Sequence, residues 1–286
     1  MEEYKIMDSF LKASQVHSNL LNKEWASHEP NTETLWHAED NEESFVLGGT
    51  GKQIRSSHVK QDYDWKNHHF TYKWNNIGLR GPDPDYKAKK RMLMIGSSLS
   101  IGQGLPLENT FTDILAKKLN YDYINLSDFY VMTDSIKRAI EISKEYKPNL
   151  VLICQTRHLF NSEMILRNLF KQIKSENKKE IVDTLWDVFL SEAQKQVYMF
   201  EQSLINNCAE DAKIVWFGPN ETNERKNKLG EMITHSDTFK YSIGHRAIFD
   251  YKNTVIDLAR DNKHPGIKSN LLIANFLEET VNDLFR

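Results

Sequence analysis

Three serines that follow one short apolar run could supply a nucleophilic hydroxyl. Residues 92–95 read Met-Leu-Met-Ile, which suits a single buried strand, and Gly96 ends the run. Ser97, Ser98 and Ser100 come directly afterwards. A small hydroxyl residue just after a buried strand is expected at the carboxyl end of that strand, where open α/β sheets bind their ligands.

The spacing around these serines does not fit three common motifs. Gly102 is followed by Gln103 with no lysine in reach, so a phosphate-binding P-loop is excluded. Gly102 and Gly104 lack the third glycine of the dinucleotide motif. Residues 96–99 begin like a Gly-x-Ser-x-Gly nucleophile elbow, but Ser100 stands where the last glycine belongs. Serines that only cap a turn remain an alternative interpretation.

A second candidate group lies in the turn DNKHPG near the end of the chain. Asp261 and His264 are three residues apart there. In a tight turn this spacing lets the carboxylate reach Nδ1 of the imidazole and leaves Nε2 as an acceptor, which is the base half of a Ser-His-Asp triad. The alternative is that the aspartate caps the final helix and the histidine packs beside it.

The pattern beyond Lys90 predicts strands that alternate with long helical segments. Such an alternation favours parallel pairing through right-handed crossovers. The expected fold class is therefore α/β, a three-layer α/β/α sandwich with a central parallel sheet. The strands are expected at 91–95, 123–126, 150–154 and 213–217, the last ended by Gly218-Pro219, and the final helix at 269–285.

Residues 1–82 are predicted to be an N-terminal extension, and residues 83–286 the α/β domain. Apolar residues at helical spacing predict an amphipathic helix over 3–25, and 69–74 alternate like a strand. A Pro-rich connector begins near residue 82 and marks the boundary.

The net charge, the cysteine count and the lack of long apolar runs exclude several classes of protein. A net charge of −3 provides no overall basic field, which argues against a nucleic-acid partner. Cys154 and Cys208 are too few for a disulfide framework, and no Cys/His spacing predicts a metal site. The N-terminus lacks the pattern of a signal peptide, and no run approaches about 20 apolar residues. We expect a soluble protein, cytoplasmic or part of a larger assembly, without a metal or organic cofactor.

Three blocks of the sequence resemble the SGNH, or GDSL, hydrolase superfamily. GSSLSIGQGLPLENTF is similar to its first block, GDSxTxGxG followed by an acidic residue, Thr and an aromatic residue. DNKHPGIKSNLLIANFL is similar to its last block, Asp-x-x-His-Pro and a helix. NNIGLRGP resembles a lead-in found in some members. The resemblance covers about residues 75–286 and implies a flavodoxin-like sheet of the SGNH type.

This resemblance implies roles for individual residues. Ser98 matches the nucleophile, Asp261 the orienting acid and His264 the general base. The implied chemistry is acyl transfer to Ser98 followed by hydrolysis with water that His264 activates. The backbone N–H of Ser98 is implied as one donor to the oxyanion.

The chain departs from the family in its oxyanion hole. Ser97 replaces the family's Asp before the nucleophile, and Ser127 replaces the glycine of the second block. The third block normally offers an Asn, whereas this chain reads Gln155-Thr-Arg157-His158. An amide or cation from Gln155, Arg157 or His158 could replace that donor, or the hole could be incomplete, which costs about 10²–10³ in rate.

The expected function is that of a serine esterase or acetylesterase acting on an acyl ester, with an O-acylated carbohydrate as one candidate substrate. Two alternatives stay open. The chain could be a weak or inactive binding or structural protein on this scaffold, with contacts in an oligomer or assembly through residues 1–82. It could also be an acyltransferase that uses the same triad.

Overall fold

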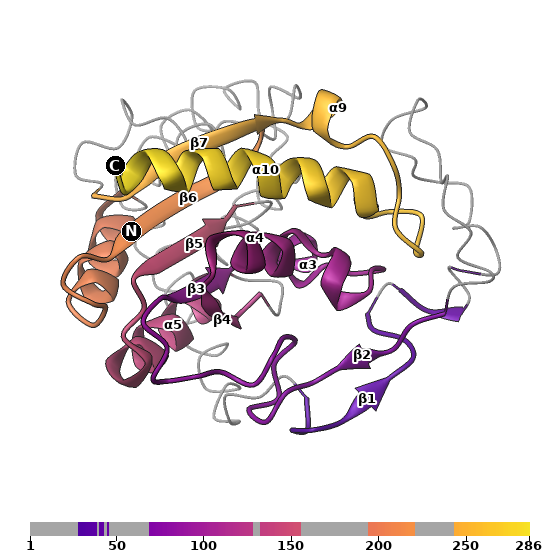
Figure 1. The fold of residues 1–286 in the computed structure, drawn as a ribbon, viewed down its shortest axis with the longest axis horizontal. Coiled ribbons are helices and arrows are strands. Elements are labelled where there is room, and N and C mark those ends of the chain that lie inside the picture. Colours follow the sequence, from indigo (N-terminus) through magenta and orange to yellow (C-terminus); the bar gives the residue numbers. More distant parts are fainter. Residues whose placement is uncertain are drawn as a thin grey trace, which may run out of the picture.

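A five-stranded parallel sheet forms the centre of the molecule (Figure 1). The computed structural model describes residues 28–38, 40–42, 45, 69–127, 132–155, 194–220 and 243–286, so the predicted helix over 3–25 lies outside the described residues. The strand order is β4-β3-β5-β6-β7. The strands are β3 (Arg91–Ile95), β4 (Asp122–Asn125), β5 (Leu150–Cys154), β6 (Lys213–Asn220) and β7 (His245–Asp250).

Helices cover both faces of this sheet, which confirms the predicted three-layer α/β fold. On one face pack α5 (Met132–Tyr146) and a helix over 194–205. On the other face α4 (Phe111–Leu119) and α10 (Ile267–Leu284) lie side by side. The shorter helices are α3 (Ser98–Ile101), the 3₁₀ turn η1 (Leu107–Asn109) and α9 (Tyr251–Thr254).

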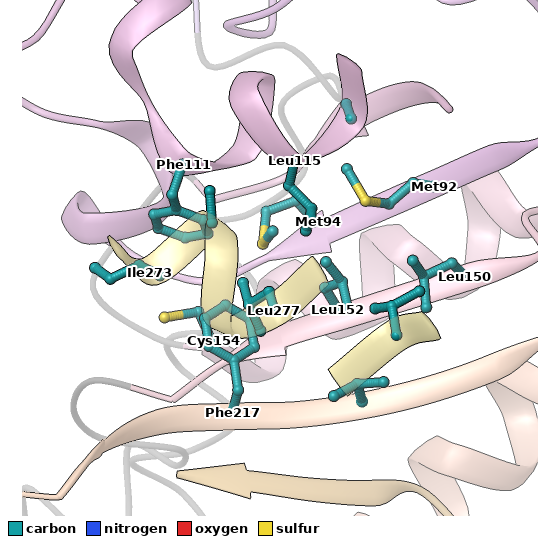
Figure 2. Packing of buried hydrophobic residues seen from close by; sticks show 14 of the residues in the cluster. Met92, Met94, Phe111, Leu115, Leu150, Leu152, Cys154, Phe217, Ile273 and Leu277 are labelled. Atoms are coloured by element: carbon teal, nitrogen blue, oxygen red, sulfur yellow. The ribbon is translucent and has the colours of Figure 1, made fainter. Parts of the chain in front are cut away.

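The residues of β3 explain why both faces are covered. Successive side chains of a strand point to opposite faces, so Leu93 and Ile95 enter the core under α5 while Met92 and Met94 face α4 and α10. A strand that is apolar on both sides is typical of a parallel sheet buried between helices. Figure 2 shows the core on the α4 and α10 face of the sheet. Side chains from β3, β5 and β6 meet Phe111, Leu115, Ile273 and Leu277 there.

The packing of α10 fixes the turn that precedes it. Ile273, Ala274, Leu277 and Val281 form the buried stripe of this helix at helical spacing. Complete burial of one such large aliphatic side chain contributes about 1.5–3 kcal/mol. The start of α10, at Ile267, follows the DNKHPG turn directly, and Ile267 packs on Leu105 and Ala259.

The prediction that Gly218-Pro219 ends the fourth strand is wrong. β6 continues to Asn220, and Pro219 pairs with Phe249 of β7. The register with β5 ends at Cys154 and Phe217, so beyond Phe217 the strand is paired on one side only. A proline is tolerated there because its missing N–H removes no bond to a second neighbour.

Smaller differences concern the ends of other elements. β4 begins at Asp122, one residue before the predicted start, and α10 begins at Ile267, two residues before it. Of the strand predicted at 69–74, only β2 (Tyr72–Lys73) forms, antiparallel to β1 (Glu33–Thr34). Residues at strand and helix ends are set by tertiary contacts that local patterns do not encode.

The described residues between 28 and 45, together with 69–74, form what we call the N-terminal layer. Tyr72 and Trp74 of this layer pack on Ile101 at the end of α3. Phe45 and Phe70 pack on Leu105 and Ala259, in the loops that follow α3 and precede α10. Figure 1 shows β1 and β2 on the side of the molecule where α3 lies. None of the helices among the described residues is long and apolar enough to cross a membrane.

Candidate active site

Ser98 is the first residue of α3, directly after β3 and its two-residue turn. Ser97 adopts an extended conformation as the N-cap, and its carbonyl accepts the N–H of Ser100 at 2.9 Å. Gly96 is required for this turn, because a Cβ on it would lie 2.2 Å from Ser100 Oγ and 3.0 Å from Cys154 Cβ. The glycine before the serines therefore lets α3 approach β3 and β5 closely.

The short helix α3 is stabilised from outside by Arg80. Gly102 ends the helix in the left-handed region, with φ of 71°. The buried guanidinium of Arg80 donates to the carbonyls of Ile101 and Gly102, at 2.7 Å each, and to that of Leu105. These carbonyls belong to the end of a helix and the following turn, where partners within the helix are missing. Arg80 thus fixes the segment that carries Ser98.

The structure brings Ser98, Asp261 and His264 together. His264 Nε2 lies 2.8 Å from Ser98 Oγ, although the two residues are 166 positions apart. His264 Nδ1 lies 2.5 Å from Asp261 Oδ2. The imidazole is 14% exposed and the carboxylate is fully buried. The imidazole therefore keeps a small exposed area, whereas the carboxylate that orients it is closed off from solvent.

The surroundings of Asp261 keep its carboxylate ionised. Burial by itself raises the pKa of Asp261, but the positive charge and the hydrogen bonds of His264, with the N–H of Lys263, outweigh it and hold the pKa below its usual value. Oδ1 accepts the backbone N–H groups of Lys263 at 3.0 Å and His264 at 3.1 Å. An ionised Asp261 favours the proton on Nδ1 of His264, which leaves Nε2 as the acceptor that faces Ser98.

The interpretation of Asp261 as the cap of the final helix is wrong, because Asp257 caps it. Asp257 Oδ2 accepts the N–H of Lys268 at 2.9 Å, and Oδ1 accepts the N–H of Ser269 at 2.9 Å and its hydroxyl at 2.5 Å. Sequence reasoning missed Asp257, which lies ten positions before the start of α10 and so outside any local capping pattern. The hydrogen bonds of the Asp261 carboxylate instead stay within its own turn, to His264 and to the N–H of Lys263.

Ser127 and Gln155 follow the two strands that flank β3, as their positions in the sequence predict. The N–H of Ser127 donates to Asn125 Oδ1 at 3.1 Å, and its buried Oγ has no partner among the described residues. Gln155 is 6% exposed, and its Oε1 likewise lacks a partner among the described residues. Arg157 and His158, the other two candidates, lie outside the described residues.

The cysteines do not offer an alternative nucleophile. Burial raises the pKa of Cys154 to about 12 and that of Cys208 to about 11. The thiolate is the reactive form of cysteine, so both side chains are inert at neutral pH. In the part of the chain that the structure describes, no three His, Cys, Asp or Glu side chains are grouped in a way that could hold a metal ion.

Comparisons with known proteins find similarity only among solved structures. No family model and no curated protein matches the chain. A carbohydrate esterase is 14% identical over 69% of this chain and 66% of its own, with a TM-score of 0.45. The psychrotrophic esterase EstA from Pseudoalteromonas sp. is 16% identical over 69% of this chain and 99% of its own, with a TM-score of 0.46. A putative lipolytic protein of the G-D-S-L family from Desulfitobacterium hafniense DCB-2 is 11% identical over 67% of this chain and 99% of its own, with a TM-score of 0.39.

Proposed function

We propose that this chain is a serine hydrolase of the SGNH type, which cleaves an acyl ester through an acyl-enzyme at Ser98. One observation carries the proposal: the continuous chain of contacts from Ser98 Oγ to His264 Nε2, at 2.8 Å, and from His264 Nδ1 to Asp261, at 2.5 Å. A base within hydrogen-bond reach of a hydroxyl, itself oriented by a third group, is the arrangement that activates serine.

In the acylation step Ser98 Oγ attacks the carbonyl carbon of the ester. His264 Nε2 takes the hydroxyl proton and then gives it to the leaving alcohol. Asp261 stabilises the imidazolium that forms, because its buried carboxylate stays ionised. A water molecule then loses a proton to His264 and attacks the acyl carbon, and His264 returns that proton to Ser98 Oγ as the bond to the acyl group breaks, which releases the acid and regenerates Ser98.

The negative charge on the ester oxygen requires hydrogen-bond donors near Ser98. The backbone N–H of Ser98 is the first candidate, since it has no acceptor among the described residues and stands at the start of α3. The side-chain amide of Gln155 is the second, at the end of the strand next to β3. Its Oε1 makes no bond among the described residues, so turning the amide toward an oxyanion would sacrifice no bond of that atom. The N–H of Ser127 is the weaker candidate, because Asn125 already accepts it.

Labelling with a fluorophosphonate probe tests the proposal directly. The wild type is expected to react covalently, and Ser98→Ala and His264→Ala are expected to lose the reaction, because one lacks the nucleophile and the other the base. Ser100→Ala is the matched control, since Ser100 lies in the same helix but is completely buried.

The outcomes separate the candidate functions. A well-folded wild type that does not react would overturn the proposal and favour a binding protein on this scaffold. If the probe reacts, hydrolysis of p-nitrophenyl acetate and of acetylated sugars, with and without an added alcohol acceptor, distinguishes an esterase from an acyltransferase.

A further inference from the structure

The side chain of Arg260 extends from the residue before Asp261 into the N-terminal layer. Its Nη2 lies 2.6 Å from Asp40 Oδ2, and its Nε lies 3.1 Å from Asp40 Oδ1. Both side chains are completely buried. Nη2 also donates to the carbonyl of Leu35 at 2.7 Å, and Nη1 donates to that of Phe70 at 3.2 Å. All three guanidinium nitrogens therefore bind acceptors in the N-terminal layer. Asp40, one of these acceptors, is 220 positions from Arg260 in the sequence.

Asp40 also reaches the loop that follows Ser98. The hydroxyl of Tyr72 donates to Asp40 Oδ2 at 2.6 Å and accepts the backbone N–H of Gly104 at 2.7 Å. Burial first, and then the charge of Asp40, raise the pKa of Tyr72, so this hydroxyl stays protonated. The same carboxylate is thus connected to the segment of Asp261 and His264 on one side and to the segment of Ser98 on the other.

A backbone hydrogen bond closes these contacts into a ring. The N–H of Arg260 donates to the carbonyl of Gly104 at 3.0 Å. The ring runs from Asp40 to Arg260, from there to Gly104, through Tyr72 and back to Asp40. A buried ion pair is often no more stabilising than apolar residues of the same volume, so its clearest effect is to specify one geometry. Here that geometry is the separation of the two segments that carry the candidate triad.

We propose that Asp40 is a positioning residue for the contact between Ser98 and His264, so that the N-terminal layer completes the active site. The proposal rests on the proposed function for its activity readout and goes beyond it in assigning a role to this layer. Because proton transfer requires His264 Nε2 within hydrogen-bond reach of Ser98 Oγ, a small displacement of the turn that contains Asp261 lowers the rate.

Asp40→Asn is the variant that tests the proposal, with Glu201→Gln as its matched control. Asn keeps the shape of Asp40 but removes the charge that pairs with Arg260. Glu201 forms a comparable ion pair with Arg246 at 2.9 Å, buried to a similar degree, between the helix over 194–205 and β7. This pair packs on Trp216 of β6, which is separated from β3 by β5.

Two readouts are needed, and one of them does not depend on turnover. The first is the rate of fluorophosphonate labelling. The second is the far-downfield proton NMR signal expected from Nδ1–H of His264 in its short bond to Asp261, assigned by its loss in His264→Ala. We expect Asp40→Asn to slow labelling by about 10- to 100-fold and to weaken this signal, as a displacement near 1 Å would do. Glu201→Gln is expected to lose as much thermal stability as Asp40→Asn but to keep the wild-type labelling rate and NMR signal.

Tyr72→Phe keeps the proposal falsifiable if Asp40→Asn does not fold. It keeps the aromatic side chain and the Asp40–Arg260 ion pair but removes the hydroxyl between Asp40 and Gly104, so it is expected to slow labelling by a smaller factor than Asp40→Asn. A folded Asp40→Asn or Tyr72→Phe that behaves like Glu201→Gln in both readouts would overturn the positioning role while leaving the proposed function intact. A wild type that fails to react, but whose downfield signal depends on Asp40, would overturn the proposed function and support the positioning role.

Discussion

The backbone N–H of Arg260 donates a 3.0 Å hydrogen bond to the carbonyl oxygen of Gly104. This bond joins the loop after Ser98 to the turn of Asp261 and His264 at the level of the main chain. The contact is close because Gly104 has no side chain: a Cβ there would lie 2.8 Å from Ala259 Cβ and 3.3 Å from the carboxyl carbon of Asp261. Its φ of +79° is also in the region that favours glycine.

Gly104→Ala is therefore expected to impair both stability and reactivity. The strained φ and the crowded Cβ should reduce the free energy of unfolding by about 1–3 kcal/mol. Pushing the turn of Asp261 away from Ser98 should slow labelling by about tenfold or more. Urea denaturation and probe kinetics measure the two effects. Labelling at the wild-type rate would mean that the Gly104–Arg260 contact does not set the triad distance.

Asp257 and Asp261 are four positions apart, and we expect substitution of the first to lower stability and substitution of the second to lower turnover. Asp257→Asn weakens the cap of α10 and should cost about 1–2 kcal/mol of stability, with little change in the labelling rate. Asp261→Asn keeps an acceptor for the N–H groups of Lys263 and His264 but favours the wrong tautomer of His264, so turnover should fall by about 10⁴ with a small change in stability. Equal loss of turnover in both variants would contradict the separate roles.

Much of the fold and the three residues of the candidate triad could be predicted from the sequence. β3 and β5 have the predicted bounds, because each is a continuous apolar run between polar residues, which marks a buried strand clearly. Ser98 is predicted from the resemblance of its block to a hydrolase family, and Asp261 and His264 from their three-residue spacing in one turn. The end of β6 could not be predicted, because it depends on tertiary pairing. The pairing with β5 ends at Phe217, whereas the pairing with β7 continues to Asn220.

The contacts that support the site are the part that the sequence does not reveal. Asp40 and Arg260 are 220 positions apart, and nothing in the residues around either one indicates the other. Tyr72 was expected only as part of a strand, yet its hydroxyl connects Asp40 to Gly104. Such pairs are specified by tertiary packing, whereas propensities and motifs describe only local structure. The predicted separation of residues 1–82 from the α/β domain stays a prediction.

Gln155 and Ser127 can be compared because each has a buried side-chain oxygen without a partner among the described residues. Gln155→Leu is expected to leave stability unchanged or higher, since it removes an unpaired polar atom from the interior. If the amide is the second oxyanion donor, turnover should fall by about 10²–10³. Ser127→Ala keeps its backbone N–H and should leave turnover unchanged. Steady-state hydrolysis of p-nitrophenyl acetate measures both, and full activity of Gln155→Leu would remove it from the oxyanion hole.

Acid is expected to destabilise the protein through His37, whose backbone pairs with that of Asp40. Their backbones exchange two hydrogen bonds, at 2.9 and 3.0 Å. Burial first, and then the charges of His28 and Arg80, lower the pKa of His37 from 6.5 to about 4. Between these two pH values the unfolded chain binds a proton at His37 that the folded chain does not, so the free energy of unfolding falls as the pH falls, and above pH 6.5 the contribution is constant.

His37→Phe tests this pH dependence while keeping an aromatic ring against Tyr72 and Trp74, whose centroids lie 5.4 and 5.1 Å from that of His37. Urea denaturation above pH 6.5 and just above pH 4 measures the free energy of unfolding at the two ends of the range. The wild type should lose about 1–2 kcal/mol more than the variant on acidification. An identical loss in both proteins would show that other groups carry the acid sensitivity. A loss confined to the wild type would identify protonation of His37 as the event that destabilises the protein in acid.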